Sequence, residues 1–82
     1  MRTVVLYGRE GCCLCDDARE ILERVRVRHP FELAERDIDA DEILLRRYLE
    51  RIPVITIDGE EVFDLFVDEP ELERRLGMVH TR

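Results

Sequence analysis

Apolar residues along the chain follow two spacings, an alternation typical of strands and a recurrence every three or four residues typical of helices. A run of β-branched and aromatic residues at positions 3–7 predicts a first strand. From about Cys13 a single apolar stripe predicts a helix, which stops before Pro30. The members of this stripe are Leu14, Ala18, Ile21, Leu22 and Val25.

The middle of the chain predicts a second strand and a second helix. Residues 31–38 form the strand, and their apolar side chains do not keep one phase, which favours a strand covered on both faces. Residues 41–50 form the helix, in which we expect Ile43, Leu44 and Leu45 to supply core contacts.

Two further strands and a third helix complete the pattern. Residues 53–57 and 60–64 predict strands joined at Asp58-Gly59, a dipeptide that favours a tight hairpin because glycine tolerates a positive φ. Asp68 and Glu71 have the spacing of a capping box, so a last helix should follow them and end at Gly77.

The resulting order, βαβαββα, predicts an α/β fold. The first strand–helix–strand unit should be a right-handed parallel crossover, and the last two strands an antiparallel hairpin. We therefore expect a mixed four-stranded sheet with helices on both faces. A chain of 82 residues has room for one such core, so residues 1–82 should form a single domain.

The charge balance narrows the classes of partner. The chain has 13 basic and 20 acidic residues and a net charge of -7. Nucleic acids and anionic membranes both require clustered positive charge, so neither is expected as a partner. No stretch approaches the roughly 20 apolar residues that span a membrane, and no secretory signal precedes the first strand. We therefore expect a cytoplasmic protein. We also expect it to be a monomer.

Three cysteines fall within four residues, at positions 12, 13 and 15. A disulfide scaffold spreads its cysteines along the chain, whereas this clustering indicates local redox or metal chemistry. The cluster lies where a strand meets a helix, so Cys12 is placed at the positive end of the helix dipole, which favours a reactive thiolate. Cys15 lies one turn further on the same helix face.

This geometry assigns separate roles to the three thiols. Side chains three apart on a helix have Cβ atoms about 5–6 Å apart, and a small adjustment at Cys12 brings them to the roughly 3.8 Å of a disulfide. We therefore expect Cys12 to attack and Cys15 to resolve, whereas Cys13 points around the helix. We expect Cys13 to be an extra exposed thiol. The alternatives are a regulatory role and the formation of a misdirected disulfide. Zinc is disfavoured because Cys13, His29 and His80 supply no second ligand pair.

The chain resembles the small glutaredoxin-like domain family of bacterial proteins, within the thioredoxin superfamily. The resemblance rests on the active-site stretch 6–18, on 37–41, on the Arg51-Ile52-Pro53-Val54 segment and on the Asp58-Gly59 turn, and it covers nearly the whole chain. It implies that Pro53 follows a cis peptide bond and packs beside the cysteines. Ile52 would then offer its backbone to an extended substrate. Arg9 stands where glutaredoxins commonly place a lysine near the glutathione carboxylate.

The resemblance implies a thiol–disulfide oxidoreductase that exchanges a Cys12–Cys15 dithiol with protein or low-molecular-weight disulfides. Such a protein needs no metal or organic cofactor, although glutathione or a recycling reductase must restore the dithiol. The chain departs from the family pattern after the fourth strand, where Asp64-Leu65-Phe66 replaces the Gly-Gly of glutathione binders. Two alternatives remain: a non-catalytic adaptor module, and a carrier of metal or an iron–sulfur cluster through Cys12.

Overall fold

A four-stranded mixed sheet forms the centre of the structure, a computed structural model that describes residues 1–77. The strands lie in the order β2-β1-β3-β4, with β1 parallel to β2 and the other two pairs antiparallel. The elements in chain order are β1 (Thr3–Gly8), α1 (Cys13–Arg28), β2 (Glu32–Asp37), a 3₁₀ turn (Ile38–Ala40), α2 (Glu42–Tyr48), β3 (Val54–Ile57), β4 (Glu60–Asp64) and α3 (Glu69–Gly77).

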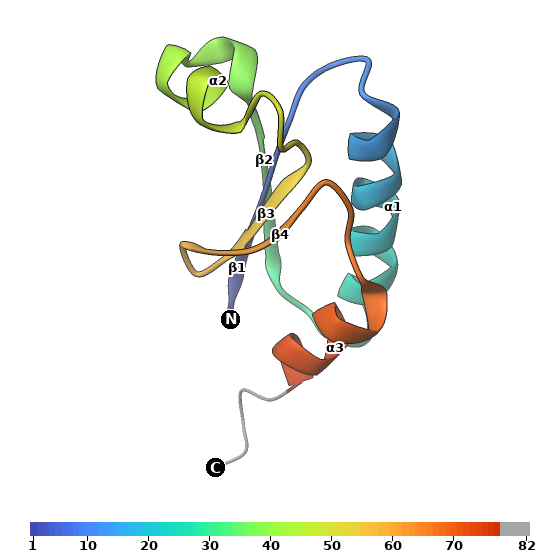
Figure 1. Ribbon diagram of the computed structural model, residues 1–82. Helices are drawn as coiled ribbons and strands as arrows, with labels where there is room; N and C mark the ends of the chain where they lie inside the picture. Colours follow the sequence, from blue (N-terminus) through green and yellow to red (C-terminus); the bar gives the residue numbers. More distant parts are fainter. Residues whose placement is uncertain (78–82) are drawn as a thin grey trace.

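Helices cover both faces of this sheet, as predicted. In Figure 1, α1 and α3 lie on one side and α2 on the other, near the end where β1 finishes. Alternate residues of the paired strands supply the two cores. Leu6 and Ile55, which are register partners, join the larger cluster with α1 and α3. Tyr7 and Val54, the next pair, belong to the smaller cluster under α2.

The second strand differs from its prediction. β2 lies at an edge of the sheet, and Leu33 is its only residue that is not exposed. The irregular phase of its apolar residues therefore reflects an open edge and not two covered faces. Phe31, which precedes the strand, and Ile38, which follows it, are both buried. The apolar residues thus sit at the ends of the strand, where the chain enters and leaves the core.

The second helix is shorter than predicted and buries fewer side chains. It spans Glu42–Tyr48, and a 3₁₀ turn that the sequence did not indicate precedes it. Leu44 and Leu45 pack against the smaller core, but Ile43 is 71% exposed, so its predicted core contact is wrong. Three consecutive apolar residues cannot all face one side of a helix.

The predicted hairpin turn is confirmed. Asp58 and Gly59 both have positive φ, 53° and 89°, as a type I′ turn requires. Within residues 1–77, no helix combines the length and the apolar character needed to cross a membrane.

Candidate active site at Cys12 and Cys15

The junction of β1 and α1 places Cys12 as the N-cap residue of the helix. Gly11, with φ of 84°, turns the chain into this position, and Cys12 itself is extended. The backbone N–H of Cys15 donates to Cys12 Sγ at 3.2 Å. The sulfur therefore occupies the place of an N-cap oxygen and accepts one of the backbone N–H groups that the first turn of the helix leaves without an intrahelical partner.

The three thiols differ in their access to solvent. Cys12 is half-buried, Cys13 is exposed and Cys15 is 1% exposed. Burial, followed by the hydrogen bond with Cys12, raises the pKa of the Cys15 thiol to about 11, although the backbone of Arg9 opposes this shift. The accessible sulfur of Cys12, at the start of the helix, thus lies one turn from the buried and protonated thiol of Cys15.

Gly8 makes room for this buried sulfur, and sequence reasoning missed it. A Cβ on Gly8 would lie 2.8 Å from Cys15 Sγ, closer than side-chain atoms tolerate. Any larger residue at the end of β1 would therefore displace the thiol. The only signal in the sequence was a glycine between a strand and a cysteine motif, and that pattern does not reveal which atom needs the space.

Strand register brings the Ile52–Pro53 segment to the same end of the sheet as the cysteine loop, where β1 finishes and β3 begins. Tyr7 pairs with Val54, so the residues that follow one and precede the other are neighbours. The Ile52–Pro53 peptide bond is cis. Pro53 is fully buried, and within the part of the chain that the structure describes, the main-chain N–H and C=O of Ile52 have no hydrogen-bond partner.

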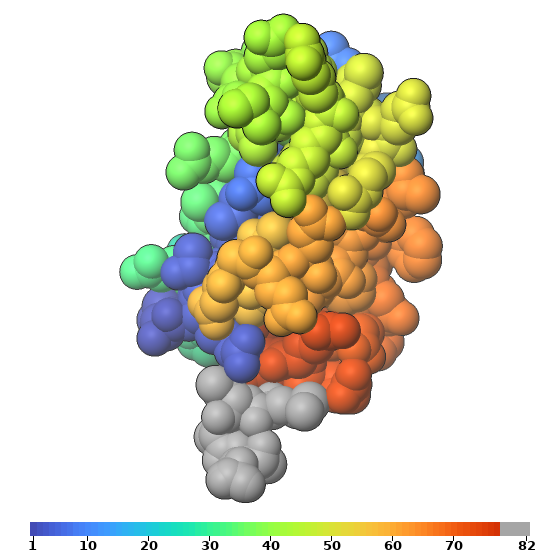
Figure 2. All heavy atoms as spheres, turned by 60° about the vertical axis from the view of Figure 1, so that its left-hand side comes forward, coloured from blue at the N-terminus to red at the C-terminus, as the bar shows by residue number. Residues whose placement is uncertain are grey.

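Neighbouring residues tie this segment to β4. The N–H of Leu65 donates to the carbonyls of Arg51 and Pro53, each at 3.0 Å. The Arg51 guanidinium reaches Glu61 at 2.5 Å and Asp64 at 3.1 Å. In Figure 2, the yellow segment before β3 accordingly lies against the orange residues after β4. The free backbone at Ile52 is thus flanked by two anchored carbonyls.

The residues after β4 adopt a turn that the sequence did not predict. Leu65 has φ of 69°, and the N–H of Phe66 donates to the Asp64 carbonyl at 2.8 Å, the hydrogen bond of a γ-turn. A leucine therefore occupies a left-handed conformation that favours glycine. The side chains of Leu65 and Phe66 are 48% and 69% exposed.

Arg9 is already paired with a carboxylate of the protein. Its guanidinium contacts Asp39 in the 3₁₀ turn at 3.2 Å through two nitrogens. A glutathione carboxylate would therefore compete with Asp39 for this side chain. Arg9 lies in the loop that leads to Cys12, but its partner Asp39 comes from a segment 30 residues away, which the sequence did not indicate.

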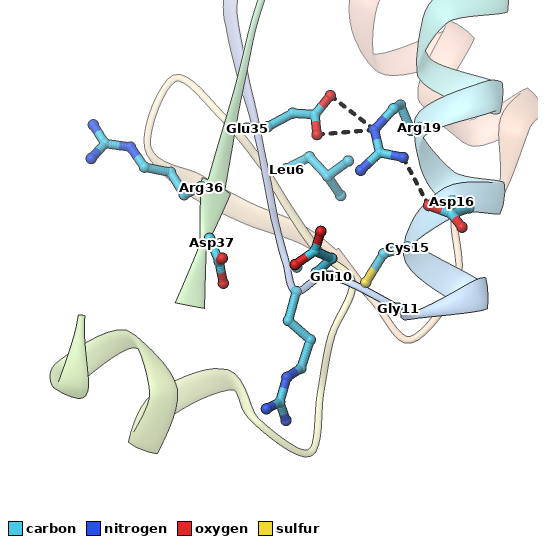
Figure 3. Close-up of a pocket in the computed structure, with 11 residues that line it drawn as sticks. Leu6, Glu10, Gly11, Cys15, Asp16, Arg19, Glu35, Arg36 and Asp37 are labelled. Carbon is cyan, nitrogen blue, oxygen red and sulfur yellow. Dashed lines mark hydrogen bonds and ion pairs between the residues drawn. The ribbon is translucent and has the colours of Figure 1, made fainter. Parts of the chain in front are cut away.

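A cavity of about 490 Å³ opens between α1 and the end of β2, on the side of Cys15 that faces β2. Arg19 lies at this cavity and points toward Glu35 and Asp16 (Figure 3). Its Nε donates to both carboxylate oxygens of Glu35 at 2.9 Å, and its Nη1 donates to Asp16 at 2.8 Å. Leu6, Gly8 and Cys15 also line it. Within residues 1–77, no group of three or more His, Cys, Asp or Glu side chains is placed to hold a metal ion. His80 lies outside the described residues.

Comparisons with solved structures agree with this fold. The chain is 35% identical to protein Ne2328 from Nitrosomonas europaea, with a TM-score of 0.81 over 92% of this chain and 91% of that one. It is also 35% identical to a protein from X. campestris, with a TM-score of 0.76 over 90% and 95% of the two chains. A thioredoxin variant from Halobacterium salinarum, 20% identical, has a TM-score of 0.70 over 99% of this chain and 75% of its own, and shares the fold.

The family comparison covers the whole site. The model of the glutaredoxin-like domain (DUF836) matches residues 3–77, which include the cysteine motif, the cis-proline segment and the turn after β4. No curated protein sequence matches the chain. With this family match over nearly its full length and a thioredoxin-like sheet carrying a Cys-x-x-Cys motif at a helix start, the chain belongs to the glutaredoxin-like domain family.

Proposed function

We propose that this protein is a thiol–disulfide oxidoreductase that works through Cys12 and Cys15. The Cys12 thiolate attacks one sulfur of a substrate disulfide, and the other sulfur leaves as a thiolate that takes up a proton. Cys15 then loses its proton and attacks Cys12 Sγ. The substrate sulfur is released, a Cys12–Cys15 disulfide forms, and two electrons have passed from the protein to the substrate.

The observation that carries this proposal is the difference between two sulfurs one helical turn apart. Cys12 Sγ accepts a backbone N–H at 3.2 Å and is reachable, whereas Cys15 is 1% exposed and its pKa is raised to about 11. A buried, protonated thiol cannot compete for an incoming disulfide. It can attack only the sulfur beside it, which is what a resolving group must do.

The unpaired backbone of Ile52 supports a protein substrate for this reaction. Its N–H and C=O are free among the described residues, and the carbonyls on either side are held by Leu65. An extended polypeptide could therefore add to this edge as a short strand. Glutathione, or a reductase with its own dithiol, would return the protein to the reduced form.

Stoichiometric exchange with insulin tests the proposal without a recycling system. The pre-reduced protein should reduce insulin disulfides, and Cys12→Ser should abolish the reaction. Cys15→Ser should accumulate a mixed disulfide between Cys12 and the substrate, visible by mass spectrometry. Cys13→Ser is the matched control because it removes an exposed thiol from the same helical turn, and it should keep the wild-type rate.

The wild type and these variants also separate exchange from the two other possibilities. A folded wild-type protein that leaves insulin oxidised and forms no mixed disulfide would favour an adaptor module. An absorbing cluster in anaerobically purified protein that disappears in Cys12→Ser would favour a metal carrier. Loss of activity in Cys13→Ser, with Cys15→Ser still active, would show that the assigned pair is wrong.

A further inference from the structure

Three exposed apolar side chains lie on two of the segments that meet at the proposed exchange site. Leu14, in the first turn of α1, is 50% exposed, and Leu65 and Phe66, after β4, are 48% and 69% exposed. Leu65 is hydrogen-bonded to the Pro53 carbonyl. Val67, the residue after Phe66, belongs to the same core cluster as Ala18 of α1, and Figure 1 shows the loop after β4 running along α1 toward α3. We call Leu14, Leu65 and Phe66 the apolar rim.

The charges near the rim are unbalanced toward the acidic side. Three arginines at this end of the sheet are engaged: Arg9 by Asp39, Arg19 by Asp16 and Glu35, and Arg51 by Glu61 and Asp64. By contrast, Glu10 and Asp17 are exposed and have no partner among residues 1–77. Glu10 lies two residues before Cys12, and Asp17 lies one turn after Cys13 on the same face of α1.

Two arginines at this end have no ion-pair partner among residues 1–77. The Arg47 guanidinium, on α2, lies over the ring of Tyr48. Arg36 has no ion-pair partner within the described range, but Figure 3 shows its side chain turned away from the cavity beside Cys15. The whole chain carries a net charge of -7. A substrate approaching Cys12 therefore meets apolar surface and an excess of negative charge, because Arg19 and Arg51 are each shared by two carboxylates while Glu10 and Asp17 have no partner among residues 1–77.

We propose, on the basis of the exchange function above, that this site selects disulfides in polypeptide segments that carry basic and apolar side chains next to the cysteine. Basic residues complement Glu10 and Asp17, and apolar residues cover Leu14, Leu65 and Phe66. Glutathione disulfide is the opposite kind of molecule, because its carboxylates outnumber its ammonium groups and it offers little apolar surface. Complementary charge raises the rate of encounter, and like charge lowers it.

Pre-reduced full-length protein tests this selectivity, since its own dithiol supplies the two electrons. Three disulfide-bridged peptides that differ only beside the cysteine are compared: one with Arg and Leu, one with Glu and Leu, and one with Arg and Ser. Glutathione disulfide and the neutral 2-hydroxyethyl disulfide complete the set. At low salt the Arg-Leu peptide should react about fivefold faster than the Glu-Leu peptide, because one close charge pair in water changes the rate by about that factor. This gap should narrow at about 0.5 M salt.

Variants assign the selectivity to the named residues. Glu10→Gln combined with Asp17→Asn should reduce the preference for Arg over Glu, and Phe66→Ser should reduce the preference for Leu over Ser. Glu32→Gln and Val27→Ser are the matched controls, because both residues are exposed and lie away from the cysteine loop, at the start of β2 and the end of α1. Both controls should keep the wild-type preferences.

The outcomes for this inference and for the exchange function are distinguishable. If the wild type reduces the neutral disulfide but treats the three peptides alike, the selectivity is overturned and the exchange function stands. Faster reaction with glutathione disulfide than with the Arg-Leu peptide would also overturn it. If the wild type fails to reduce the neutral disulfide, the exchange function fails and the selectivity fails with it.

Discussion

Individual residues of the site differ sharply in their surroundings, although several are close in sequence. Cys12 and Cys15 are three residues apart, yet one sulfur caps a helix and the other rests against the backbone of Gly8. Leu65 is likewise distinguished by its backbone, with φ of 69° where a glycine would be favoured. Each of these features leads to a measurable consequence.

The burial of Cys15 predicts the pH dependence of the resolving step. Its pKa is raised to about 11, so only a small fraction is ionised at neutral pH, and that fraction grows about tenfold per pH unit. Burial is the main cause, and it persists when Cys12 is in a mixed disulfide. In a Cys13→Ser background, the release of a preformed Cys12 mixed disulfide should therefore accelerate with pH well beyond 9. A rate that levels off below pH 8 would contradict this.

The left-handed conformation of Leu65 predicts a stabilising substitution. Leu65→Gly should raise the free energy of unfolding by about 0.5–1 kcal/mol, because relief of the backbone exceeds the entropy cost of glycine. Gly59→Ala is the converse control: φ is 89° and no atom lies within 4 Å of the added Cβ, so any loss reflects backbone alone. Urea denaturation measures both changes. If Leu65→Gly lowered the free energy of unfolding instead, backbone strain at Leu65 would be ruled out.

Helix α1 carries the site at one end and is held to α3 at the other. Glu69, at the start of α3, accepts from Arg24 at 2.8 Å and Arg28 at 3.0 Å, both near the end of α1. Val67 and Leu72 on either side are buried in the larger core. The N–H of Glu71 donates to Asp68 at 3.4 Å, as the predicted cap requires, but the Glu71 carboxylate pairs with Arg74 and Arg75.

This junction predicts an acid-sensitive component of stability. Arg24 and Arg28 lower the pKa of Glu69 to about 2. A carboxylate with a lowered pKa stabilises the fold above its ordinary value of 4.5, and that stabilisation is lost as the pH falls from 4.5 toward 2. Glu69→Gln should therefore lose less stability than the wild type between pH 6 and pH 3 in denaturant titrations.

A matched control is available on α2. Glu42→Gln breaks an exposed pair with Arg46 that is confined to one helix. If Glu69→Gln lost as much stability on acidification as the wild type, the α1–α3 ion pairs would not be the acid-sensitive contacts.

The molecule as a whole assembles its candidate site from three loops that are distant in sequence. They follow β1, precede β3 and follow β4. The register pairs Tyr7–Val54 and Val54–Asp64 bring all three loops to one end of the sheet. The loop after β4 contributes Leu65 and Phe66 at a place where glutathione-binding glutaredoxins have two glycines. Arg9, the cation that could receive a glutathione carboxylate, is held by Asp39.

These features predict slow reaction with glutathionylated substrates. Side by side with a glutathione-binding glutaredoxin, the protein should remove glutathione from a mixed disulfide at a much lower rate. Asp39→Asn, which frees Arg9 from its ion pair, should recover part of the rate, whereas Glu42→Gln should not. A wild-type rate equal to that of the glutaredoxin would show that neither the leucine turn nor the Arg9 pairing limits glutathione.

Local patterns of the sequence were sufficient for the order of elements and for the chemistry of the motif. The helix that begins at Cys13, the Asp58-Gly59 turn and the cap at Asp68 each depend on residues within a few positions of one another, so their signals survive without the fold. The placement of Cys12 at a helix start is of the same kind.

Features that depend on contacts between distant segments were not readable in this way. The edge position of β2, the exposure of Ile43, the pairing of Arg9 with Asp39 and the close approach of Gly8 to Cys15 all require the strand order and the packing of loops. Sequence periodicity records which residues are apolar, but not which neighbour arrives from 30 positions away. The motif therefore follows from local chemistry, whereas the surface that a substrate meets follows from the way the sheet brings three loops together.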